Sequence, residues 1–370
     1  MTIFTMDNLY TAYRQCIRNK KDTANALAFE MHREENLVRL LRELQTETYT
    51  ISRHICFVVK NPVPREIFAS HFRDRVVQHL LYNEIEEIFE QQFSPHTYAN
   101  RVGKGTHRAF KKARFFIARG GKNRQKLHYL KMDIKNFFRS VHKETLWNLM
   151  SREITKQKQP ELWKTEVLML LRIIIFHNPA EDYYFKGEAW TKKLIRKEKS
   201  LLSGDATRGL PIGNITSQLF ANIYLHHMDM FIEQTLGVTR YVRYVDDFIL
   251  FDENRDDLQE NIYKIQGFLH EHLLIKVCED KTILSSIGQG VDFLGYYLKP
   301  THTLVRRKVV KRFKRALYHV SESKAFDNLL TSYCGHCSHA HSFNLLSTVA
   351  LQLFLTSSSF KEEPPDVSSE

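Results

Sequence analysis

The run Tyr241-Val-Arg-Tyr-Val-Asp-Asp-Phe-Ile-Leu-Phe251 places two adjacent carboxylates, Asp246 and Asp247, inside an otherwise apolar and β-prone stretch. Aspartate is depleted in strands, and two neighbouring carboxylates repel each other and lose hydration when their flanks are buried. A bound divalent cation would offset that cost. The alternative is a hairpin turn that leaves both side chains in water, since turns are rich in aspartate.

The composition predicts a globular protein with a polyanionic partner. The 370 residues are 43% hydrophobic and include 54 Lys and Arg against 42 Asp and Glu, which gives a net charge of +12. Nucleic acid and an anionic membrane both fit that charge. Membrane is the weaker alternative, because the most apolar segment, Val167 to Phe176, contains Arg172 and is shorter than the ~20 residues of a span.

The cysteines and the start of the chain predict a cytoplasmic protein. No basic segment followed by an apolar one, as in a secretory signal, is visible after Met1. The five cysteines are scattered and odd in number, which argues against a disulfide framework and for a reducing compartment.

Hydrophobic spacing predicts a mixture of helices and strands. We expect helices over residues 7–44, 74–93, 161–176, 216–236 and 256–273, and strands over residues 51–59, 127–138 and 291–298. Residues 178–205 are polar and loop-like, and Gly209–Gly213 is a turn. A hairpin is expected around Asp246 and Asp247.

Two basic segments predict surfaces for nucleic acid. Residues 101–126 carry ten Lys or Arg and no acidic residue, with phenylalanines interleaved. Residues 306–315 carry seven Lys or Arg beside an apolar stripe of Val309, Val310 and Phe313. Both patterns are typical of basic amphipathic helices. For the first segment, the alternative is a solvated helix face.

A third carboxylate, Asp133, lies on the strand predicted over residues 127–138, where Leu130, Met132 and Ile134 share the opposite face. Alone it would be an ordinary residue of a polar face. Carboxylates from two strands that pair in the middle of a sheet can hold two Mg²⁺ ions about 3.5–4 Å apart, which is the arrangement for in-line phosphoryl transfer.

Five ordered motifs between about Ile51 and Leu298 resemble those of reverse transcriptases. They are Asp133 with Phe138, Gly209-Leu-Pro-Ile-Gly-Asn-Ile-Thr-Ser-Gln-Leu-Phe-Ala-Asn-Ile-Tyr-Leu225, Tyr244-Val-Asp-Asp247, Glu279-Asp-Lys-Thr282 and Phe293-Leu-Gly-Tyr296. The resemblance implies an α+β right-hand polymerase fold with fingers, an antiparallel-sheet, ferredoxin-like palm and a helical thumb. The implied ranges are 1–127 for N-terminal helices and fingers, 128–299 for the palm with a helical and loop insertion at 142–207, 300–356 for the thumb and 357–370 for a disordered tail.

The resemblance also implies an RNA-directed DNA polymerase that uses two Mg²⁺ ions, with Mn²⁺ as a possible substitute. The implied metal ligands are Asp133, Asp246 and Asp247 with the carbonyl of Ile134. Lys281 resembles the lysine that protonates leaving pyrophosphate, and a plain surface charge is the alternative.

Phe138 is similar to the aromatic gate that excludes a 2′ hydroxyl and so selects deoxynucleotides, unless Phe137 and Phe138 are simply core. The expected nucleotide-binding residues are Arg65, Arg73, Arg75, Phe138, Ile212 and Gly213. The expected nucleic-acid-binding residues are Arg101, Lys104, Lys111, Lys112, Arg306, Arg307, Lys311 and Arg315. Guanidinium groups pair bidentately with phosphate. For Arg75, a local ion pair with Asp74 is the alternative.

Departures from the common pattern indicate a subtype. Many relatives have Gln-Gly where this chain has Ile212-Gly213, and the Ile-Gly-Asn-x-x-Ser-Gln variant resembles reverse transcriptases of diversity-generating retroelements, as do Ser332-Tyr-x-Gly-His336 and His339-Ala-His-Ser342. In that family a bacterial or phage-encoded enzyme copies a template RNA with errors at adenines, for mutagenic retrohoming. A small basic accessory protein often assists it.

Two other functional hypotheses remain open. One is another bacterial reverse transcriptase, of the group II-like, retron or phage-defence type, although Asn25-Ala-Leu-Ala-Phe29 lacks the histidine expected of a retron enzyme and no Val-Thr-Gly occurs. The other is a catalytically idle RNA-binding protein, against which the three intact carboxylates argue.

Cys334-Gly-His-Cys337 suggests zinc or a redox dithiol. A zinc site usually has a second ligand pair at regular spacing, and a redox motif needs a βαβ context. Neither is visible, so a purely structural role is the leading interpretation.

Overall fold

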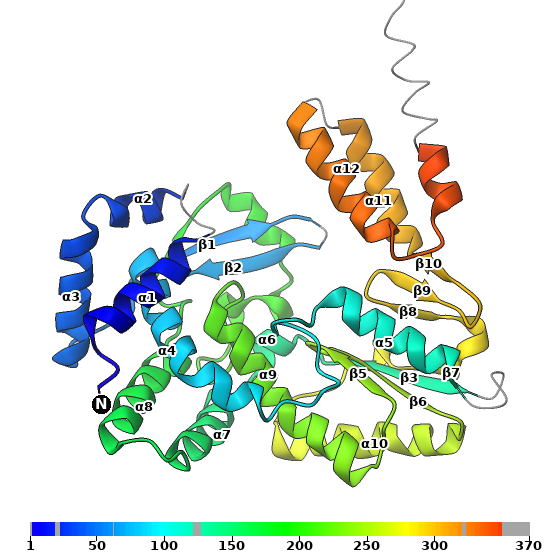
Figure 1. The fold of residues 1–370 in the computed structure, drawn as a ribbon, viewed down its shortest axis with the longest axis horizontal. Helices are drawn as coiled ribbons and strands as arrows, with labels where there is room; N and C mark the ends of the chain where they lie inside the picture. The colour runs from blue at the N-terminus through cyan, green and yellow to red at the C-terminus, as the bar shows by residue number, and fades with distance from the viewer. Residues whose placement is uncertain (1, 19–22, 62, 121–126, 320–322, 350–370) are drawn as a thin grey trace, which may run out of the picture. The chain divides into compact units, whose positions relative to one another are not determined.

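The computed structural model describes residues 2–18, 23–61, 63–120, 127–319 and 323–349, and Figure 1 shows their helices and strands. The helices are α1 (Met6–Ile17), α2 (Ala24–Glu30), α3 (Arg33–Gln45), α4 (Phe72–Glu90), α5 (Thr106–Ala118), α6 (Phe137–Ser140), α7 (Lys143–Thr155), α8 (Glu161–Phe176), α9 (Ile215–Met230), α10 (Arg255–His272), α11 (Arg307–His319) and α12 (Ser323–Cys337). The tail expected at 357–370 lies outside the described residues.

Within these described ranges the strands form three small sheets. The strands are β1 (His54–Val59), β2 (Arg65–Ala69), β3 (His128–Asp133), β4 (Tyr183–Phe185), β5 (Tyr241–Tyr244), β6 (Asp247–Asp252), β7 (Ile283–Ser286), β8 (Val291–Phe293), β9 (Tyr296–Leu298) and β10 (Thr303–Val305). The sheet orders are β2-β1-β4, β10-β9-β8 and β5-β6-β3-β7. The last sheet carries all three predicted carboxylates on β3, on β6 or in the β5–β6 turn.

By density of contacts the chain divides into two compact units, one of residues 1–105, 130–250 and 259–283 and the other of residues 106–129, 251–258 and 284–370. Both units are discontinuous in sequence, whereas the expected fingers, palm and thumb ranges are continuous. That assignment stays a prediction. No helix within the described ranges is long and apolar enough to cross a membrane.

The first unit is built around α4. Its side chains Val76, Val77 and Leu80 are buried, as the three- and four-residue spacing predicts. Helices α1, α8 and α9 pack against it. Thr5 begins α1 by accepting a hydrogen bond from the Asn8 amide, which satisfies one of the unpaired donors of the first turn.

The sheet β2-β1-β4 corrects one expectation. Residues 178–205 were expected to be loop, but Tyr183–Phe185 pairs in parallel with β1, and β2 pairs with β1 antiparallel. A strand of three residues is too short for an alternation of polar and apolar residues to reveal it in the sequence. The neighbouring His177 stacks on His54 of β1 with ring centroids 4.9 Å apart.

The buried His54 predicts a loss of stability in mild acid. Burial, with the charges of His177 and Arg75, lowers the His54 pKa from 6.5 to about 4. Between those values the unfolded chain binds a proton that the folded chain rejects. We therefore expect the free energy of unfolding, measured by urea denaturation, to fall by up to about 3 kcal/mol as the pH drops through that range. His54→Gln should flatten the dependence, and an equally steep decline in this variant would contradict the assignment.

The second unit holds a further correction. Residues 291–298 were expected to be one strand, but they form the hairpin β8-β9, in which Phe293 pairs with Tyr296. Leu294 and Gly295 make the two-residue turn with φ values of 50° and 90°. Both central residues of such a turn need positive φ, which explains the glycine. On the same unit, Phe110 of α5 stacks on Tyr296 at 4.1 Å.

The helix expected to end at residue 236 is shorter than expected. Helix α9 ends at Met230, and Phe231–Thr235 continues as one π-helical turn. The buried face of α9 includes Asn222, Tyr224 and Asp229, three polar side chains. Asn222 and Asp229 belong to the buried network described below.

Candidate active site

Asp133 lies where the sequence alternation predicts, at the end of β3. Leu130, Met132 and Ile134 are fully buried, while the Asp133 side chain is on the other face. The Lys281 Nζ is 2.7 Å from its Oδ1, which joins two of the predicted catalytic residues.

Asp246 lies in the tight turn between β5 and β6, where Tyr244 pairs with Asp247. The amide of Ile134 donates to the Asp246 carbonyl at 3.2 Å, so the turn meets the end of β3. Burial and the charge of Asp133 raise the Asp246 pKa to about 6, against the opposing effects of Lys281 and Arg65. Two of the predicted carboxylates are therefore neighbours, although they are 113 positions apart in the chain.

Val245, just before Asp246, has φ +57°, a left-handed conformation that is strained for a β-branched residue. Such strain persists only where the surroundings impose it. The backbone strain of Val245 lies next to the Asp246 carboxylate, and strain of this kind is common at functional sites.

Asp247 opens β6, and its Oδ2 is 3.4 Å from the Lys131 Nζ. Its other oxygen, Oδ1, is buried and has no hydrogen-bond partner among the described residues. Burial raises the Asp247 pKa to about 7, and the charges of Asp133 and Asp246 add to that effect while Lys131 opposes it. The three carboxylates are thus close enough to perturb one another.

These residues suit a divalent cation. Carboxylate oxygens are the hard ligands that Mg²⁺ prefers, and a cation would relieve both the mutual repulsion and the unpartnered Oδ1 of Asp247. Among the described residues no three His, Cys, Asp or Glu side chains already stand in a metal-binding cluster. Convergence of Asp133, Asp246 and Asp247 on shared ions stays a prediction.

A buried ion pair supports the turn from behind, and sequence reasoning missed it. Arg243 and Asp229 have no exposed surface, and the Arg243 Nη2 lies 2.6 Å from the Asp229 Oδ2. Tyr241 and Thr97 also donate to Asp229. The Arg243 Nη1 donates to the carbonyl of Val245 at 3.1 Å, so this network holds the strained residue beside Asp246.

The predicted triphosphate arginines divide into two groups. Arg65 is exposed at the start of β2, and its positive charge opposes the rise in the Asp246 pKa. Arg73 pairs with Glu43 and lies 3.6 Å from Asp74, and Arg75 donates to the Ser70 carbonyl at 2.9 Å. The alternative of an Arg75–Asp74 pair therefore gives way to an Arg73–Asp74 pair. Arg65 keeps its side chain available, whereas Arg73 and Arg75 serve the fold.

Phe137 and Phe138, the two aromatic residues after β3, differ in burial. Phe137 is 2% exposed and belongs to the core. Phe138 is half-buried, and its carbonyl accepts from the Leu210 amide at 2.7 Å, which ties it to the turn before α9. In that turn Ile212 is half-buried. Gly213 is exposed with φ +114°, and a Cβ there would lie 3.1 Å from Ile67.

In the first basic segment, Arg101 is 7% exposed at its side chain and pairs with Glu90 at 2.7 Å. Its guanidinium also donates to the Ser94 and Thr97 carbonyls, so the geometry does not favour nucleic-acid binding by this residue. Lys104 donates to the Pro95 carbonyl at 2.9 Å.

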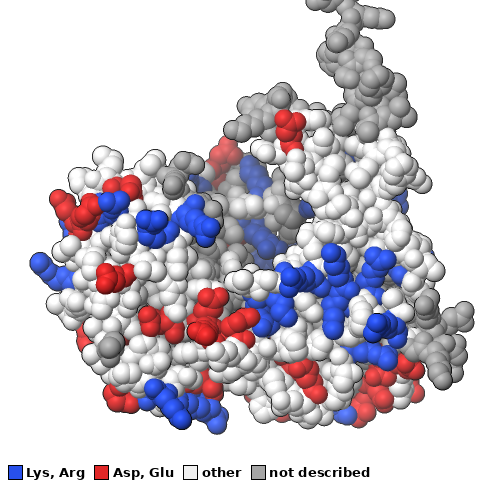
Figure 2. All heavy atoms as spheres, in the orientation of Figure 1, with Lys and Arg blue, Asp and Glu red and all other residues white. Residues whose placement is uncertain are grey.

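Helix α5 presents the rest of the first basic segment. Figure 2 shows Lys and Arg side chains gathered over this helix. Lys111 is exposed, and Lys112 lies 4.8 Å from the ring centre of Phe116. The residues after Gly120 that belong to this segment lie outside the described ranges.

Helix α11 in the second unit has the predicted amphipathic form. Phe313 is 1% exposed and stacks on Tyr333 of α12 at 4.3 Å. Arg307, Lys311 and Arg315 are exposed. Arg306 pairs with Asp292 at 2.9 Å, just before the helix.

The Cys-x-x-Cys motif ends α12. Cys337 is buried and Cys334 half-buried, and both are free thiols. Burial raises the pKa of the Cys337 thiol. These observations favour the structural interpretation.

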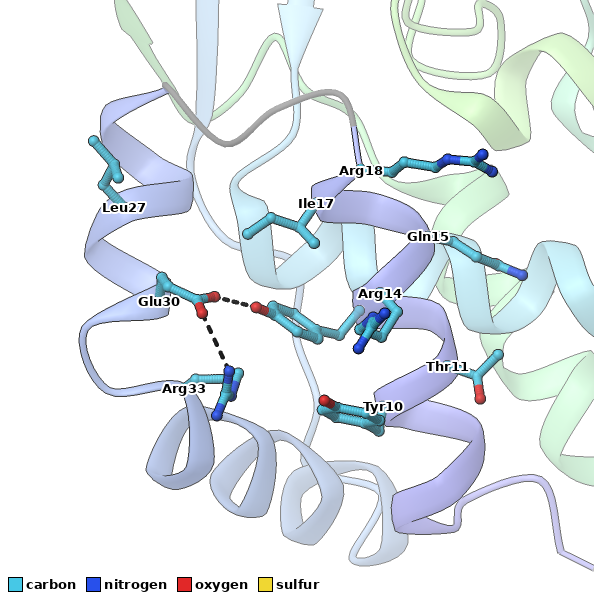
Figure 3. A pocket seen from close by; sticks show the side chains of 10 residues that line it. Tyr10, Thr11, Arg14, Gln15, Ile17, Arg18, Leu27, Glu30 and Arg33 are labelled. Carbon is cyan, nitrogen blue, oxygen red and sulfur yellow. Dashed lines mark hydrogen bonds and ion pairs between the residues drawn. The ribbon is translucent and has the colours of Figure 1, made fainter.

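A cavity of about 960 Å³ lies on the N-terminal helices, apart from the carboxylates in sequence (Figure 3). Glu30 accepts from the Tyr13 hydroxyl and lies 3.2 Å from Arg33. The cationic side chain of Arg33 is therefore paired within the wall of this cavity. None of the predicted catalytic residues lines it.

Comparison with known proteins agrees with the motif order. The sequence profile of the family described as reverse transcriptase (RNA-dependent DNA polymerase) matches residues 64–298. The group II intron-encoded protein LtrA of Lactococcus lactis subsp. cremoris is 23% identical over 386 residues, covering 84% of this chain and 58% of LtrA. Protein YkfC of Escherichia coli (strain K12) is 22% identical over 307 residues, covering 74% of this chain and 72% of YkfC.

Among solved structures, apo telomerase from Candida tropicalis matches with a TM-score of 0.50 at 13% identity, covering 76% of this chain and 51% of that chain. This likeness concerns the fold, and it agrees with the predicted α+β polymerase fold. The chain spans 58% of the length of LtrA. By its sequence profile the chain belongs to the reverse transcriptase (RNA-dependent DNA polymerase) family.

Proposed function

We propose that the protein is an RNA-directed DNA polymerase that extends a primer with deoxynucleotides on a template RNA. The observation that carries this proposal is the meeting of Asp133 with the Asp246-Asp247 turn in a chain of this family. Mg²⁺ at these carboxylates, or Mn²⁺, would activate the primer 3′ hydroxyl and hold the triphosphate. The test is primer extension by purified protein on a defined RNA template.

The residues around the carboxylates take the other roles. Lys281, which lies 2.7 Å from Asp133, would give a proton to leaving pyrophosphate. Arg65 is exposed close to Asp246 and would meet the triphosphate. The half-buried Phe138 would pack under the sugar and favour deoxynucleotides over ribonucleotides.

The basic helices supply the surface for template RNA and for the RNA/DNA duplex. Helix α11 exposes Arg307, Lys311 and Arg315 on the face opposite Phe313, and α5 exposes Lys111. Phosphate contacts of this kind give affinity that falls with salt and carries no sequence preference.

We place the enzyme in the cytosol of a bacterial cell.

We further propose that the enzyme serves a diversity-generating retroelement, with a small basic accessory protein. The support is Ile212-Gly-Asn-x-x-Ser217-Gln together with the His-containing segments near residues 336 and 339. The similarity to LtrA favours a group II-like enzyme as the second candidate. The neighbouring DNA distinguishes them, because only the first requires a near-repeat pair that differs mainly at adenines.

Ile212→Gln is expected to lower misincorporation opposite template adenine. An amide beside the nascent base pair can sense its geometry by hydrogen bonding, whereas isoleucine offers only shape. A contact worth ~1 kcal/mol corresponds to about fivefold in discrimination. Sequencing of primer-extension products measures the change, with Ile212→Leu as the control. An unchanged error spectrum in Ile212→Gln would show that Ile212 does not cause the misincorporation opposite adenine.

A further inference from the structure

A basic hollow of about 370 Å³ lies in the first unit beside the end of β3. Its charged lining is Lys135, Arg139, Arg208 and Lys276, with Glu198 and Asp205 as the acidic members. Cationic side chains outnumber carboxylates there, which favours an anionic ligand.

The hollow begins two residues after Asp133 along the chain, at Lys135. Ile134 bridges Val277 in antiparallel fashion, and both are buried. Lys135 follows this bridge as the first residue of the turn that leads into α6. The Lys135 amide donates to the Lys276 carbonyl at 2.8 Å, so the two lysines are directly opposite each other.

Two like charges in directly opposed positions beside an antiparallel bridge repel each other. Both lysines are exposed, and no ion pair is formed by either within the described residues. Two lysines beside the carboxylates differ, since Lys131 pairs with Asp247 and Lys281 pairs with Asp133. A multivalent anion between Lys135 and Lys276 would turn their repulsion into attraction.

The two arginines form a fixed part of the wall. Arg139 donates to the carbonyls of residues 198, 200 and 203 at 2.8–3.0 Å. Arg208 donates to the Ser140 and Leu274 carbonyls at 2.9 and 2.8 Å. The charge of Arg208 also acts on Asp205 in the lining, but four cationic side chains against two carboxylates leave the hollow with a net positive charge, which favours an anion.

We infer that this hollow is a phosphate-binding subsite whose occupant is the pyrophosphate released by nucleotide addition, an inference that rests on the proposed function. In that reaction the primer 3′ hydroxyl gives its proton to solvent as its oxygen bonds to the α-phosphorus, and the bond from the α-phosphorus to the bridging oxygen breaks. Pyrophosphate leaves with the electron pair and takes up a proton. Lys135, two residues after Asp133, and Lys276 opposite it receive the pyrophosphate. A phosphodiester of the nucleic-acid backbone presents the same chemistry.

The test compares the full chain with Lys135→Ala/Lys276→Ala and with a control, Lys158→Ala/Lys193→Ala, which removes two exposed lysines of the same unit that do not line the hollow. Titration calorimetry with inorganic pyrophosphate, without primer or nucleotide, gives the affinity. We expect about tenfold weaker binding in the first variant, wild-type binding in the control and retention in Lys135→Arg/Lys276→Arg. The affinity for primer–template, measured by anisotropy, should stay within about twofold.

Unchanged pyrophosphate binding in Lys135→Ala/Lys276→Ala would overturn the inference. Weakened primer–template binding with unchanged pyrophosphate affinity would overturn it in favour of a backbone contact. Because calorimetry needs no turnover, a wild-type protein that binds pyrophosphate through these lysines yet makes no cDNA would leave the subsite standing and refute the polymerase.

Discussion

Asp246→Asn is expected to reduce cDNA synthesis by at least about 10³-fold while leaving the fold and RNA binding intact. The substitution keeps the shape of the side chain and removes the negative charge that a divalent cation needs. Burial and the charge of Asp133 raise the Asp246 pKa, so the negative charge that the substitution removes is unfavourable in the metal-free folded protein. The free energy of unfolding in metal-free buffer should therefore not fall. Primer extension and RNA binding by anisotropy measure the two activities.

Asp257→Asn serves as the control, since Asp257 is an exposed residue in the first turn of α10. It should retain wild-type synthesis. Substantial synthesis by Asp246→Asn would remove this carboxylate from the catalytic set. If wild type and variant both bind RNA and neither makes cDNA, the idle RNA-binding hypothesis takes the place of the polymerase.

Asp229→Asn should destabilise the protein by about 3–5 kcal/mol, because it leaves the Arg243 guanidinium buried without its counter-charge. Both side chains have no exposed surface, and two Asp229 oxygens accept from Arg243. The variant should also slow primer extension, since Arg243 supports the Val245 carbonyl beside Asp246. Urea denaturation measures the loss.

The exposed pair Glu260–Lys264 on α10 provides the matched control. Glu260→Gln is expected to cost less than about 0.5 kcal/mol, because an exposed ion pair contributes little. Asp229→Leu combined with Arg243→Met should recover part of the loss, since neither charge is then left unpaired. A change below about 1 kcal/mol in Asp229→Asn would mean that the pair does not hold the hairpin.

The strand and the turn that carry the three carboxylates were predictable from the sequence because their signal is local. Alternation around Asp133 identifies its face, and the adjacent aspartates interrupt a β-prone run. The β8-β9 hairpin was missed because two short paired strands have the same alternation as one long strand. Gly295 was the available signal, since its positive φ marks the turn.

Residues whose partners are remote in sequence were not predictable in the same way. Arg73 and Arg101 carry the charge expected of phosphate-binding residues, but Glu43 and Glu90 pair with them in the fold. Arg243 gave a partial signal, since alternation places it with the inward-facing Tyr241. Its partner Asp229 lies on α9, and only the packing of that helix reveals the pair.

The most direct test of the central claim is the position of bound metal. Crystals of the protein with primer–template, a non-reacting deoxynucleotide and Mn²⁺ allow the ions to be located by anomalous diffraction. We predict two ions about 3.5–4 Å apart, with Asp133 and Asp246 both coordinating. An ion bound to the Asp246-Asp247 turn without Asp133, or no ion at these carboxylates, would contradict the account.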